Sequence, residues 1–264
     1  MSTSSSRQPG IAVVTGASSG IGRAAAIALT ARGWTCILSG RSEEELKKTA
    51  NLAIAARQEL YPTETPNPIC VPGDLSDVVN IVTLFDVVRK SFGRLDLLFN
   101  NAGIGSPKVP LQDVSLESFD ALININVRVP FLCTQEAFRI MSAQSPQGGR
   151  IINNGSLSSM VPRPLSAPYT LSKHAISGLT KSTSLDGRKY NIACSQLDIG
   201  NAASAMSAAK TDGALQANGK IEVEPIFEVD FAGEAVCYMA SLPLHVNILN
   251  QTLMATDMPF VGRG

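Results

Sequence analysis

Tyr169 and Lys173 stand four residues apart in a stretch whose apolar spacing predicts a helix. Helical geometry places both side chains on one face. A free phenol has a pKa of about 10 and is a weak acid near neutral pH, but a neighbouring ammonium stabilises the phenolate. The pair could therefore act as a tuned general acid and base. The alternative is that the two residues are ordinary neighbours on a helix surface, because this spacing is common by chance.

A serine upstream of this pair favours the catalytic interpretation. Ser156 lies thirteen residues before Tyr169, just after the apolar run 150–154, which we predict to be a strand. A hydroxyl at the end of that strand could hydrogen-bond the same substrate oxygen as Tyr169.

A glycine-rich turn lies near the N-terminal end of the chain. The apolar run 11–14 leads into Gly16, Gly20 and Gly22, and an alanine-rich stretch of helical composition follows. Glycines allow positive φ and a close approach to a ligand, and the N-terminus of the next helix offers unpaired N–H groups to a pyrophosphate. A tight turn without a ligand is the alternative, but the strand-to-helix context favours dinucleotide binding. The spacing Gly-x-x-x-Gly-x-Gly differs from the commoner fingerprint Gly-x-Gly-x-x-Gly.

The end of the second predicted strand bears on the choice of cofactor. NAD-binding proteins usually carry an acid about 20 residues past the glycine turn, where it binds the ribose 2′-OH. Here Gly40 takes that position, and Arg41 and Ser42 follow. A guanidinium binds a 2′-phosphate that a carboxylate would repel, so we expect NADP(H) rather than NAD(H). The alternative is that Arg41 pairs with an acid such as Glu43 or Glu45.

With these motifs in place, the chain resembles the short-chain dehydrogenase/reductase family from about residue 10 to its C-terminus. The resemblance also rests on Asp74 after Gly73 and on Asn100-Asn101-Ala102-Gly103 after an apolar strand. It implies a catalytic tetrad of Asn126, Ser156, Tyr169 and Lys173. It also implies that the cofactor is bound by Gly16, Ser18, Ser19, Gly20, Ile21, Gly22, Arg41, Ser42, Asp74, Leu75, Asn100, Ala102, Gly103, Tyr169, Lys173, Gly200 and Ser204.

The resemblance implies hydride transfer between a nicotinamide and the carbon of a carbonyl or alcohol, with Tyr169 exchanging the proton of the oxygen. Ser156 would orient that oxygen, Lys173 would also bind the nicotinamide ribose, and Asn126 would hold a water for proton relay. Two alternatives stay open: an NADP(H)-sensing binding protein without turnover, and a non-redox cyclase or epimerase that borrows the cofactor.

Three positions depart from the family pattern. Asn124 competes with Asn126 for the tetrad position, and Val129 stands where the family usually has glycine. Ile199 replaces a proline before Gly200, while Ser204 falls at the position of a threonine that would contact the nicotinamide carboxamide. The following stretch, near 205–225, has small side chains and is expected to form a substrate lid.

Composition limits the class of partner. The 264 residues, 44% of them hydrophobic, suit one α/β domain with a proper core, from residue 10 to residue 264. A formal net charge of zero does not support binding to nucleic acid or to an anionic membrane. The polar start, residues 1–9, is expected to be a flexible tail, and no apolar run is long enough to cross a membrane, so we expect a cytoplasmic protein.

The cysteines and histidines suggest no further site. The five cysteines lack metal-ligand spacing and are expected to be buried thiols, so no metal is predicted. His174 is expected to be a packing or surface residue, and His245 has no assigned function.

Short β-rich runs alternate with longer helical stretches, which predicts a single-domain, Rossmann-like, doubly wound α/β fold. We expect a seven-stranded parallel sheet with helices on both faces and a proline-rich surface loop at 61–68. The family resemblance also implies a homotetramer or homodimer. The predicted strands lie near 11–15, 35–39, 68–71, 95–99, 150–154, 191–197 and 247–255.

Overall fold

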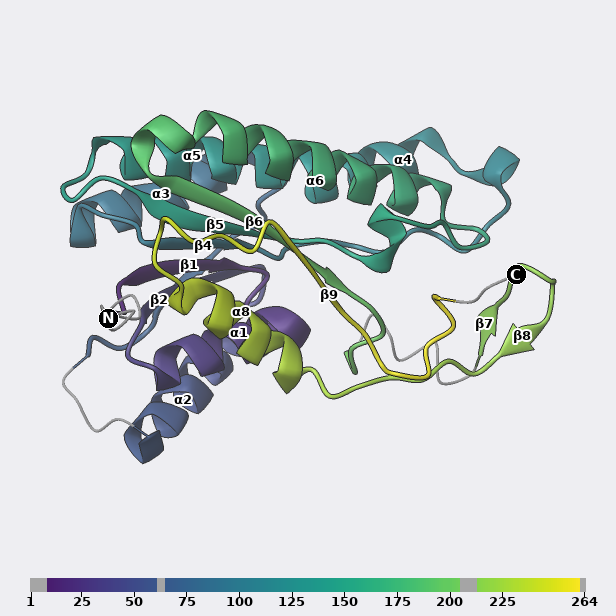
Figure 1. Cartoon of the computed structure of the whole chain (residues 1–264), viewed down its shortest axis with the longest axis horizontal. Coiled ribbons are helices and arrows are strands. Elements are labelled where there is room, and N and C mark those ends of the chain that lie inside the picture. The colour runs from purple at the N-terminus through teal and green to yellow at the C-terminus, as the bar shows by residue number, and fades with distance from the viewer. Residues whose placement is uncertain (1–8, 61–64, 205–212, 262–264) are drawn as a thin grey trace.

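A seven-stranded parallel sheet forms the centre of the molecule, as predicted (Figure 1). The computed structural model describes residues 9–60, 65–204 and 213–261. Most of the predicted N-terminal tail, half of the predicted loop at 61–68 and the first part of the predicted lid lie outside the described residues.

All seven predicted strands are present, and their order is β3-β2-β1-β4-β5-β6-β9. Every neighbouring pair is parallel. The boundaries differ most at the last strand, which begins at Asn250 and is shorter than predicted. The strands of this sheet are β1 (Ile11–Thr15), β2 (Thr35–Gly40), β3 (Ile69–Pro72), β4 (Leu97–Asn100), β5 (Gly149–Asn154), β6 (Ile192–Ile199) and β9 (Asn250–Leu253).

Helices cover both faces of the sheet. Figure 1 shows α1, α2 and α8 on one side, and α3, α4, α5 and α6 on the other. Crossovers that return to the same edge of the sheet require such helices, so this arrangement follows from the parallel strands. The helices are α1 (Gly20–Ala31), α2 (Glu43–Leu60), α3 (Val78–Phe92), α4 (Leu116–Ile123), α5 (Val129–Ala143), α6 (Ala167–Asp186) and α8 (Asp230–Ser241).

The core has two parts because side chains alternate between the faces of a strand. Ala12 and Val14 pack with residues of α1 and α8 on one face. Val13 packs with residues of α3 and α5 on the other face. All four residues of β4 are buried, as expected of a strand covered on both faces.

Two elements of the structure are absent from the sequence prediction. Residues Asn124–Arg128 form a π-helical turn, η2, between α4 and α5, and such turns are frequent at functional sites. Within the predicted lid, β7 (Ala214–Leu215) and β8 (Ile221–Glu222) pair as an antiparallel hairpin. The remaining short 3₁₀ turns are η1 (Leu111–Asp113), η3 (Leu157–Ser159) and η4 (Arg188–Tyr190).

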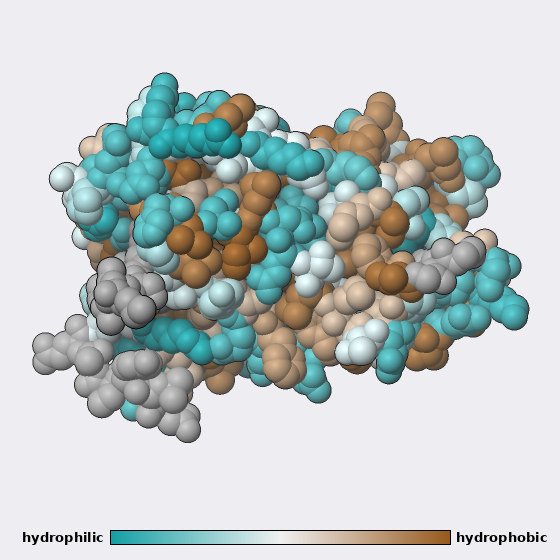
Figure 2. Space-filling view, in the orientation of Figure 1, coloured by the Kyte–Doolittle hydropathy of each residue, from teal (hydrophilic) through white to brown (hydrophobic). Residues whose placement is uncertain are grey.

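Figure 2 shows one face of the molecule, on which hydrophobic residues form several separate groups among hydrophilic ones. None of the described helices combines the length and apolarity needed to cross a bilayer. The five cysteines are free thiols, and Cys70 is only half-buried. Burial raises the pKa of the other four to about 12, which makes them poor nucleophiles: Cys36, Cys133, Cys194 and Cys237.

Candidate active site

Most of the predicted functional residues follow the carboxyl ends of the parallel strands, and these ends meet at one edge of the sheet. The glycine turn follows β1, and the Asn-Asn-Ala-Gly segment follows its neighbour β4. The chain winds outward in opposite directions from these two strands, which makes the gap between them the topological switch point. Ligands of open α/β sheets bind at this point.

The glycine turn after β1 is held in place by Asn101. Gly16 has a φ of +64° and Gly20 a φ of +53°, a region that disfavours other residues. Asn101 Nδ2 donates to the backbone oxygens of Thr15 at 3.0 Å and of Gly16 at 3.2 Å. A side chain at Gly16 would collide with this amide, since its Cβ would lie 2.9 Å from Asn101 Nδ2.

The two asparagines after β4 have different surroundings. The sequence prediction selected Asn100, whose buried amide donates to Thr134 Oγ1 at 3.0 Å and to Asn153 Oδ1 at 2.9 Å, on the α5 side of the sheet. The side-chain amide of Asn100 therefore supports the sheet. The sequence prediction missed the role of Asn101, although the doubled asparagine at a strand end was a visible signal.

The start of α1 is suited to an anion. Its N-cap, Ser19, is extended, and its side chain makes no capping hydrogen bond. The first N–H groups of this helix therefore lack a side-chain partner within the described chain, while the helix dipole favours negative charge there. Ile21 is half-buried against the core, and a Cβ at Gly22 would lie only 2.2 Å from the backbone oxygen of Gly16.

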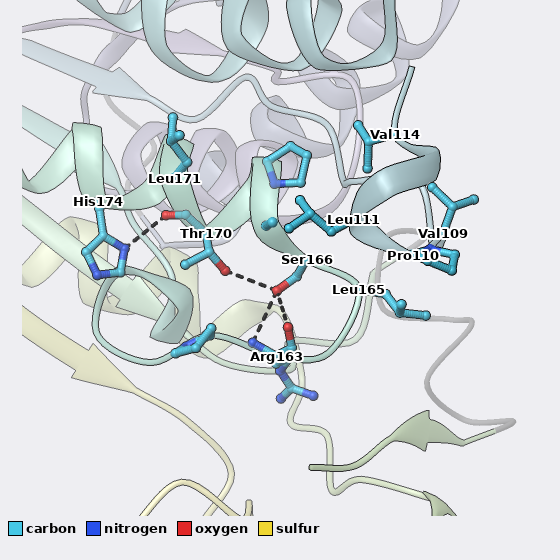
Figure 3. Close-up of a pocket in the computed structure, with 13 residues that line it drawn as sticks. Val109, Pro110, Leu111, Val114, Arg163, Leu165, Ser166, Thr170, Leu171 and His174 are labelled. Carbon is cyan, nitrogen blue, oxygen red and sulfur yellow. Dashed lines mark hydrogen bonds between the residues drawn. The ribbon is translucent and has the colours of Figure 1, made fainter. Parts of the chain in front are cut away.

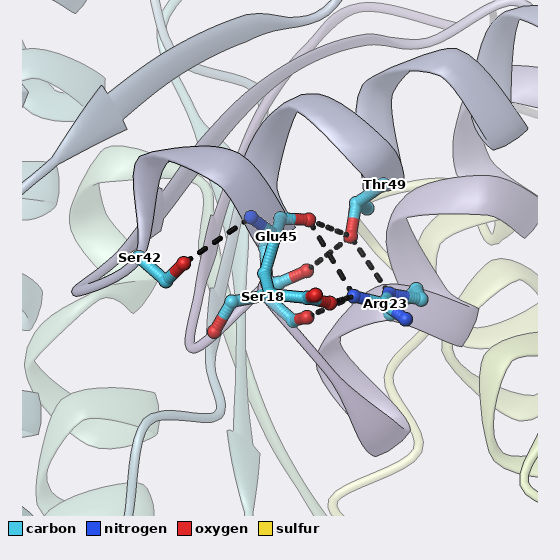
Figure 4. Close-up of polar contacts among 6 residues, drawn as sticks. Ser18, Arg23, Ser42, Glu45 and Thr49 are labelled. Carbon is cyan, nitrogen blue, oxygen red and sulfur yellow. Dashed lines mark hydrogen bonds and ion pairs between the residues drawn. The ribbon is translucent and has the colours of Figure 1, made fainter.

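A polar network ties this turn to α2 (Figure 4). Arg23 donates to the backbone oxygen of Ser18, forms an ion pair with Glu45 and donates to Thr49 Oγ1 at 2.9 Å. Thr49 Oγ1 in turn donates to the backbone oxygen of Ala17 at 2.9 Å. These bonds fix the turn against α2.

Arg41 does not pair with either candidate glutamate. Glu43 pairs with Lys47, and Glu45 pairs with Arg23. Arg41 is exposed at the end of β2. Beside it, Ser42 accepts a bond from the backbone N–H of Glu45 at 3.2 Å and so begins α2.

The predicted adenine site lies after β3. Asp74 is exposed, and Leu75 beside it is buried. Bonds from the backbone and side chain of Ser76, with a smaller effect from Arg41, hold the pKa of the Asp74 carboxyl below its ordinary value. Asp74 is therefore ionised near neutral pH, within electrostatic range of Arg41.

Lys173 joins α6 to the end of β5. Its side chain is only 8% exposed, and its Nζ donates to the backbone oxygen of Asn154 at 2.8 Å. The same Nζ lies 5.5 Å from the centre of the Tyr169 ring. Within the described chain the Tyr169 hydroxyl makes no hydrogen bond, so it is available to a ligand. Tyr169 and Lys173 therefore share one face of α6, as their spacing predicts, and this face is turned toward the sheet.

Ser156 lies two residues after Asn154. Its Oγ accepts a bond from the backbone N–H of Ser158 at 3.2 Å and thereby begins η3, which packs against α6. The Ser156 backbone N–H donates to Asp198 Oδ1 at 2.8 Å. The described residues supply no acceptor for the Ser156 hydroxyl proton, so this proton can be donated outward.

Asn126, and not Asn124, contacts the loop after β4. Its buried amide bonds Ile104 twice, accepting from the backbone N–H at 2.8 Å and donating to the backbone oxygen at 2.9 Å. It also donates to Ser172 Oγ on α6 at 3.3 Å. A Cβ at Gly103 would lie 3.2 Å from Asn126 Oδ1. Asn124 instead points toward the backbone oxygen of Ser76. The π-helical turn thus brings Asn126 between the β4 loop and α6.

The segment after β6 reaches the glycine turn. Ile199, in place of the family's proline, is the last residue of β6, and the backbone N–H of Gly200 donates to Leu253 at 2.8 Å. A Cβ at Gly20 would lie 3.3 Å from Ser204 Cβ, so Ser204 adjoins the turn.

A buried carboxylate anchors the described part of the predicted lid. Glu224, two residues after β8, forms an ion pair with Arg163 of the β5–α6 loop at 2.6 Å. It also accepts from Asn201 at 2.8 Å and from Gln216 at 3.0 Å. Burial raises the pKa of Glu224, but these bonds outweigh burial and lower it to about 2. The hairpin is therefore tied to the loop that carries the chain from Ser156 toward Tyr169.

A cavity of about 700 Å³ lies on the outer face of α6 (Figure 3). Its lining is mostly apolar and includes Leu111, Leu165 and Leu171. His174 also lines it, exposed as predicted, with Nδ1 2.9 Å from the backbone oxygen of Thr170. Tyr169 and Ser156 are not among its lining residues, so the cavity does not mark the reacting centre. No group of metal-ligating side chains is found among the described residues.

A model of the short chain dehydrogenase family matches residues 10–214. The chain belongs to this family. A 3beta-hydroxysteroid dehydrogenase of Mediterraneibacter gnavus is 34% identical over 187 residues, which are 71% of this chain and 64% of that relative. The sulfoacetaldehyde reductase 2 of Chromohalobacter salexigens is 29% identical over 248 residues, covering 93% and 94% of the two chains.

The fold agrees with this membership. The solved structure of a metagenomic short-chain oxidoreductase in complex with NADP has a TM-score of 0.75 and 28% identity, over 93% of this chain and 96% of that one. The resemblance inferred from the sequence is confirmed. As a short chain dehydrogenase with relatives named dehydrogenase and reductase, the protein is an oxidoreductase that acts on alcohol or carbonyl groups.

Proposed function

We propose that the protein reduces a ketone or aldehyde with NADPH, or runs the reverse oxidation, with Tyr169 as the acid and base. The observation that carries this proposal is the position of Lys173, a buried ammonium beside the Tyr169 ring and hydrogen-bonded to the strand end that precedes Ser156. A structural helix residue would have no need to bury a charge at this place, because burial of an ammonium is costly.

The residues around the glycine turn fit a dinucleotide phosphate. The turn has two glycines of positive φ, and the following helix begins without a side-chain cap. Arg41 stands exposed at the end of β2, where no carboxylate occupies the position of the ribose acid. These features support NADP(H) over NAD(H), and the metagenomic relative was solved with NADP. The turn, Arg41 and Ser42 would hold the phosphates.

When bound, the nicotinamide supplies or accepts the hydride. The Ser156 hydroxyl donates a hydrogen bond to the substrate oxygen and polarises the carbonyl, while one lone pair of its oxygen accepts from the Ser158 N–H. Tyr169 gives its proton to the same oxygen as negative charge develops there. Lys173 stabilises the resulting phenolate by its charge. Asn126 fixes the β4 loop against α6 and so positions the helix that carries Tyr169 and Lys173.

The test is NADPH oxidation with a panel of ketones, aldehydes, quinones and imines, followed by the Tyr169→Phe variant with every active compound. We expect turnover with at least one carbonyl, and a loss of about 10²- to 10⁴-fold in kcat for the variant with NADPH affinity nearly unchanged. Tyr190→Phe is the matched control, because Tyr190 packs edge to face on Phe138. NADPH binding without consumption of any carbonyl would favour a binding protein or a non-redox enzyme instead.

The remaining predictions concern the domain, the lid, the oligomeric state and the location of the protein. We propose one domain from residue 10 to residue 264, a lid that includes the β7–β8 hairpin, a homotetramer or homodimer, and a cytoplasmic location. Mass measurement by size-exclusion chromatography tests the oligomer.

A further inference from the structure

Asp198 is a fully buried carboxylate at the end of β6. Four donors surround it. Its Oδ1 accepts from the Ser156 backbone N–H at 2.8 Å, from Ser159 Oγ at 2.8 Å and from Gln196 Nε2 at 2.7 Å. Its Oδ2 accepts from Asn250 Nδ2 at 2.6 Å. A buried charge is tolerated only when it is hydrogen-bonded in this way, because removing it from water is costly.

The contact with Ser156 depends on a close approach of two strand ends. A Cβ at Gly155 would lie 2.0 Å from Asp198 Oδ1, so the carboxylate reaches the Ser156 backbone only because residue 155 is glycine. Gln196 also lies on β6 and, like Asp198, is turned toward α6, where its Oε1 bonds Thr180 at 3.2 Å. Asp198 is thus aimed at the β5 end from a neighbouring strand.

Two hydrogen bonds already engage the backbone N–H and the hydroxyl oxygen of Ser156. Asp198 holds the backbone N–H, and the Ser158 N–H holds one lone pair of the hydroxyl oxygen. The hydroxyl proton is the only donor of Ser156 left for a substrate. Moving the backbone by a fraction of a bond length would change where this proton points.

We infer that Asp198 is a positioning residue for Ser156, and that its carboxylate sets the direction in which the Ser156 hydroxyl meets the substrate oxygen. This inference rests on the proposed role of Ser156 in carbonyl reduction. It differs from a purely structural role, in which the buried network would stabilise the fold without affecting the reaction.

The experiment combines variants of Asp198 and Ser156, with 2,3-butanedione and NADPH as the probe reaction. Asp198→Ala should lower kcat by about 10- to 100-fold, as expected when a catalytic hydroxyl is misplaced, with little change in the KM for NADPH. Asp198→Asn keeps the Oδ1 acceptor and should stay within about threefold of wild type. In a Ser156→Ala background, Asp198→Ala should cause no further loss of kcat. An equal loss in both backgrounds would overturn the inference.

Ser159→Ala is the matched control, since Ser159 bonds the same oxygen and has no role in the proposed reaction. It should lower the free energy of unfolding and leave kcat near wild type; a kcat loss as large as that of Asp198→Ala would point to a general structural role and count against the inference. If Asp198→Ala does not fold, Asp198→Thr, which is closer in volume, replaces it with the same expectations.

Crystal structures of the Asp198 variants provide a readout that needs no turnover. We expect Ser156 Oγ to be displaced in the Ala or Thr variant and in place in the Asn variant. An undisplaced Ser156 in the Ala or Thr variant overturns the inference even if no carbonyl is reduced. Failure of the proposed function would instead appear as wild-type protein that reduces nothing in the carbonyl panel.

Discussion

Lys173 Nζ donates a 2.8 Å hydrogen bond to the backbone oxygen of Asn154, across nineteen residues of sequence. This bond fixes the ammonium between the helix that carries Tyr169 and the strand end that leads to Ser156. It places the charge where it can act on the phenol, because Nζ is 5.5 Å from the centre of the ring.

Replacing Lys173 by Met should remove the charge while filling a similar volume. We expect kcat for carbonyl reduction to fall by at least about 10²-fold, since the phenolate of Tyr169 loses its stabilising partner. Lys181→Met is the control, because Lys181 lies exposed two turns further along the same helix. Steady-state kinetics with NADPH measures both variants, and unchanged kcat in Lys173→Met would remove Lys173 from the mechanism.

Replacing Arg41 by Ala should weaken the binding of NADPH and spare NADH. A charge-assisted hydrogen bond contributes about 1.5–3 kcal/mol, which corresponds to a rise of about 10- to 100-fold in the Kd of NADPH. Isothermal titration calorimetry with both dinucleotides gives the two values. Lys90→Ala removes one positive charge from α3 and serves as the control for net charge. Equal loss of affinity for both dinucleotides would argue against a 2′-phosphate contact.

Replacing Asn101 by Ala should loosen the glycine turn, because two backbone oxygens lose their donor. We expect the free energy of unfolding to fall by about 1–3 kcal/mol and the Kd of NADPH to rise. Urea denaturation and calorimetry measure the two effects. The control is Asn51→Ala on the exposed side of α2. If affinity stays at the wild-type level, the turn does not need Asn101 to bind its ligand.

Glu224 should make stability depend on pH in the acid range. Its folded pKa of about 2 is below the ordinary value of 4.5, so the ionised form favours the folded state. Its contribution is complete above pH 4.5 and is lost as the pH falls toward 2. The difference in free energy of unfolding between wild type and Glu224→Gln should therefore shrink between these values.

Urea denaturation at several pH values checks this prediction, with Glu222→Gln as the control on the exposed part of the same hairpin. A difference between wild type and Glu224→Gln that does not vary with pH would mean that the carboxylate charge does not hold the hairpin.

Much of the fold could be predicted because its signals are local. The strand at 11–15 is an apolar run bounded by glycines, and its boundaries agree with β1. The hairpin β7–β8 escaped prediction because each strand has two residues, too few for a period to be visible. The π-helical turn at Asn124–Arg128 was not predicted. It differs from an α-helix only in that each backbone hydrogen bond spans one more residue, and amino-acid composition does not reveal this difference.

The sequence by itself selected the features on which the proposed chemistry of this protein rests: the spacing of Tyr169 and Lys173, the glycine turn and the missing acid after the second strand. These are properties of neighbouring residues. Only the tertiary structure decided which of two adjacent asparagines holds the turn, that Asp198 reaches Ser156, and that Glu224 meets Arg163. Those contacts join residues 42 to 86 positions apart, and they depend on strand order and on which face of the sheet each side chain occupies. Strand order and side-chain facing are both set by the pairing of strands that are distant in sequence, and no single stretch of sequence specifies that pairing.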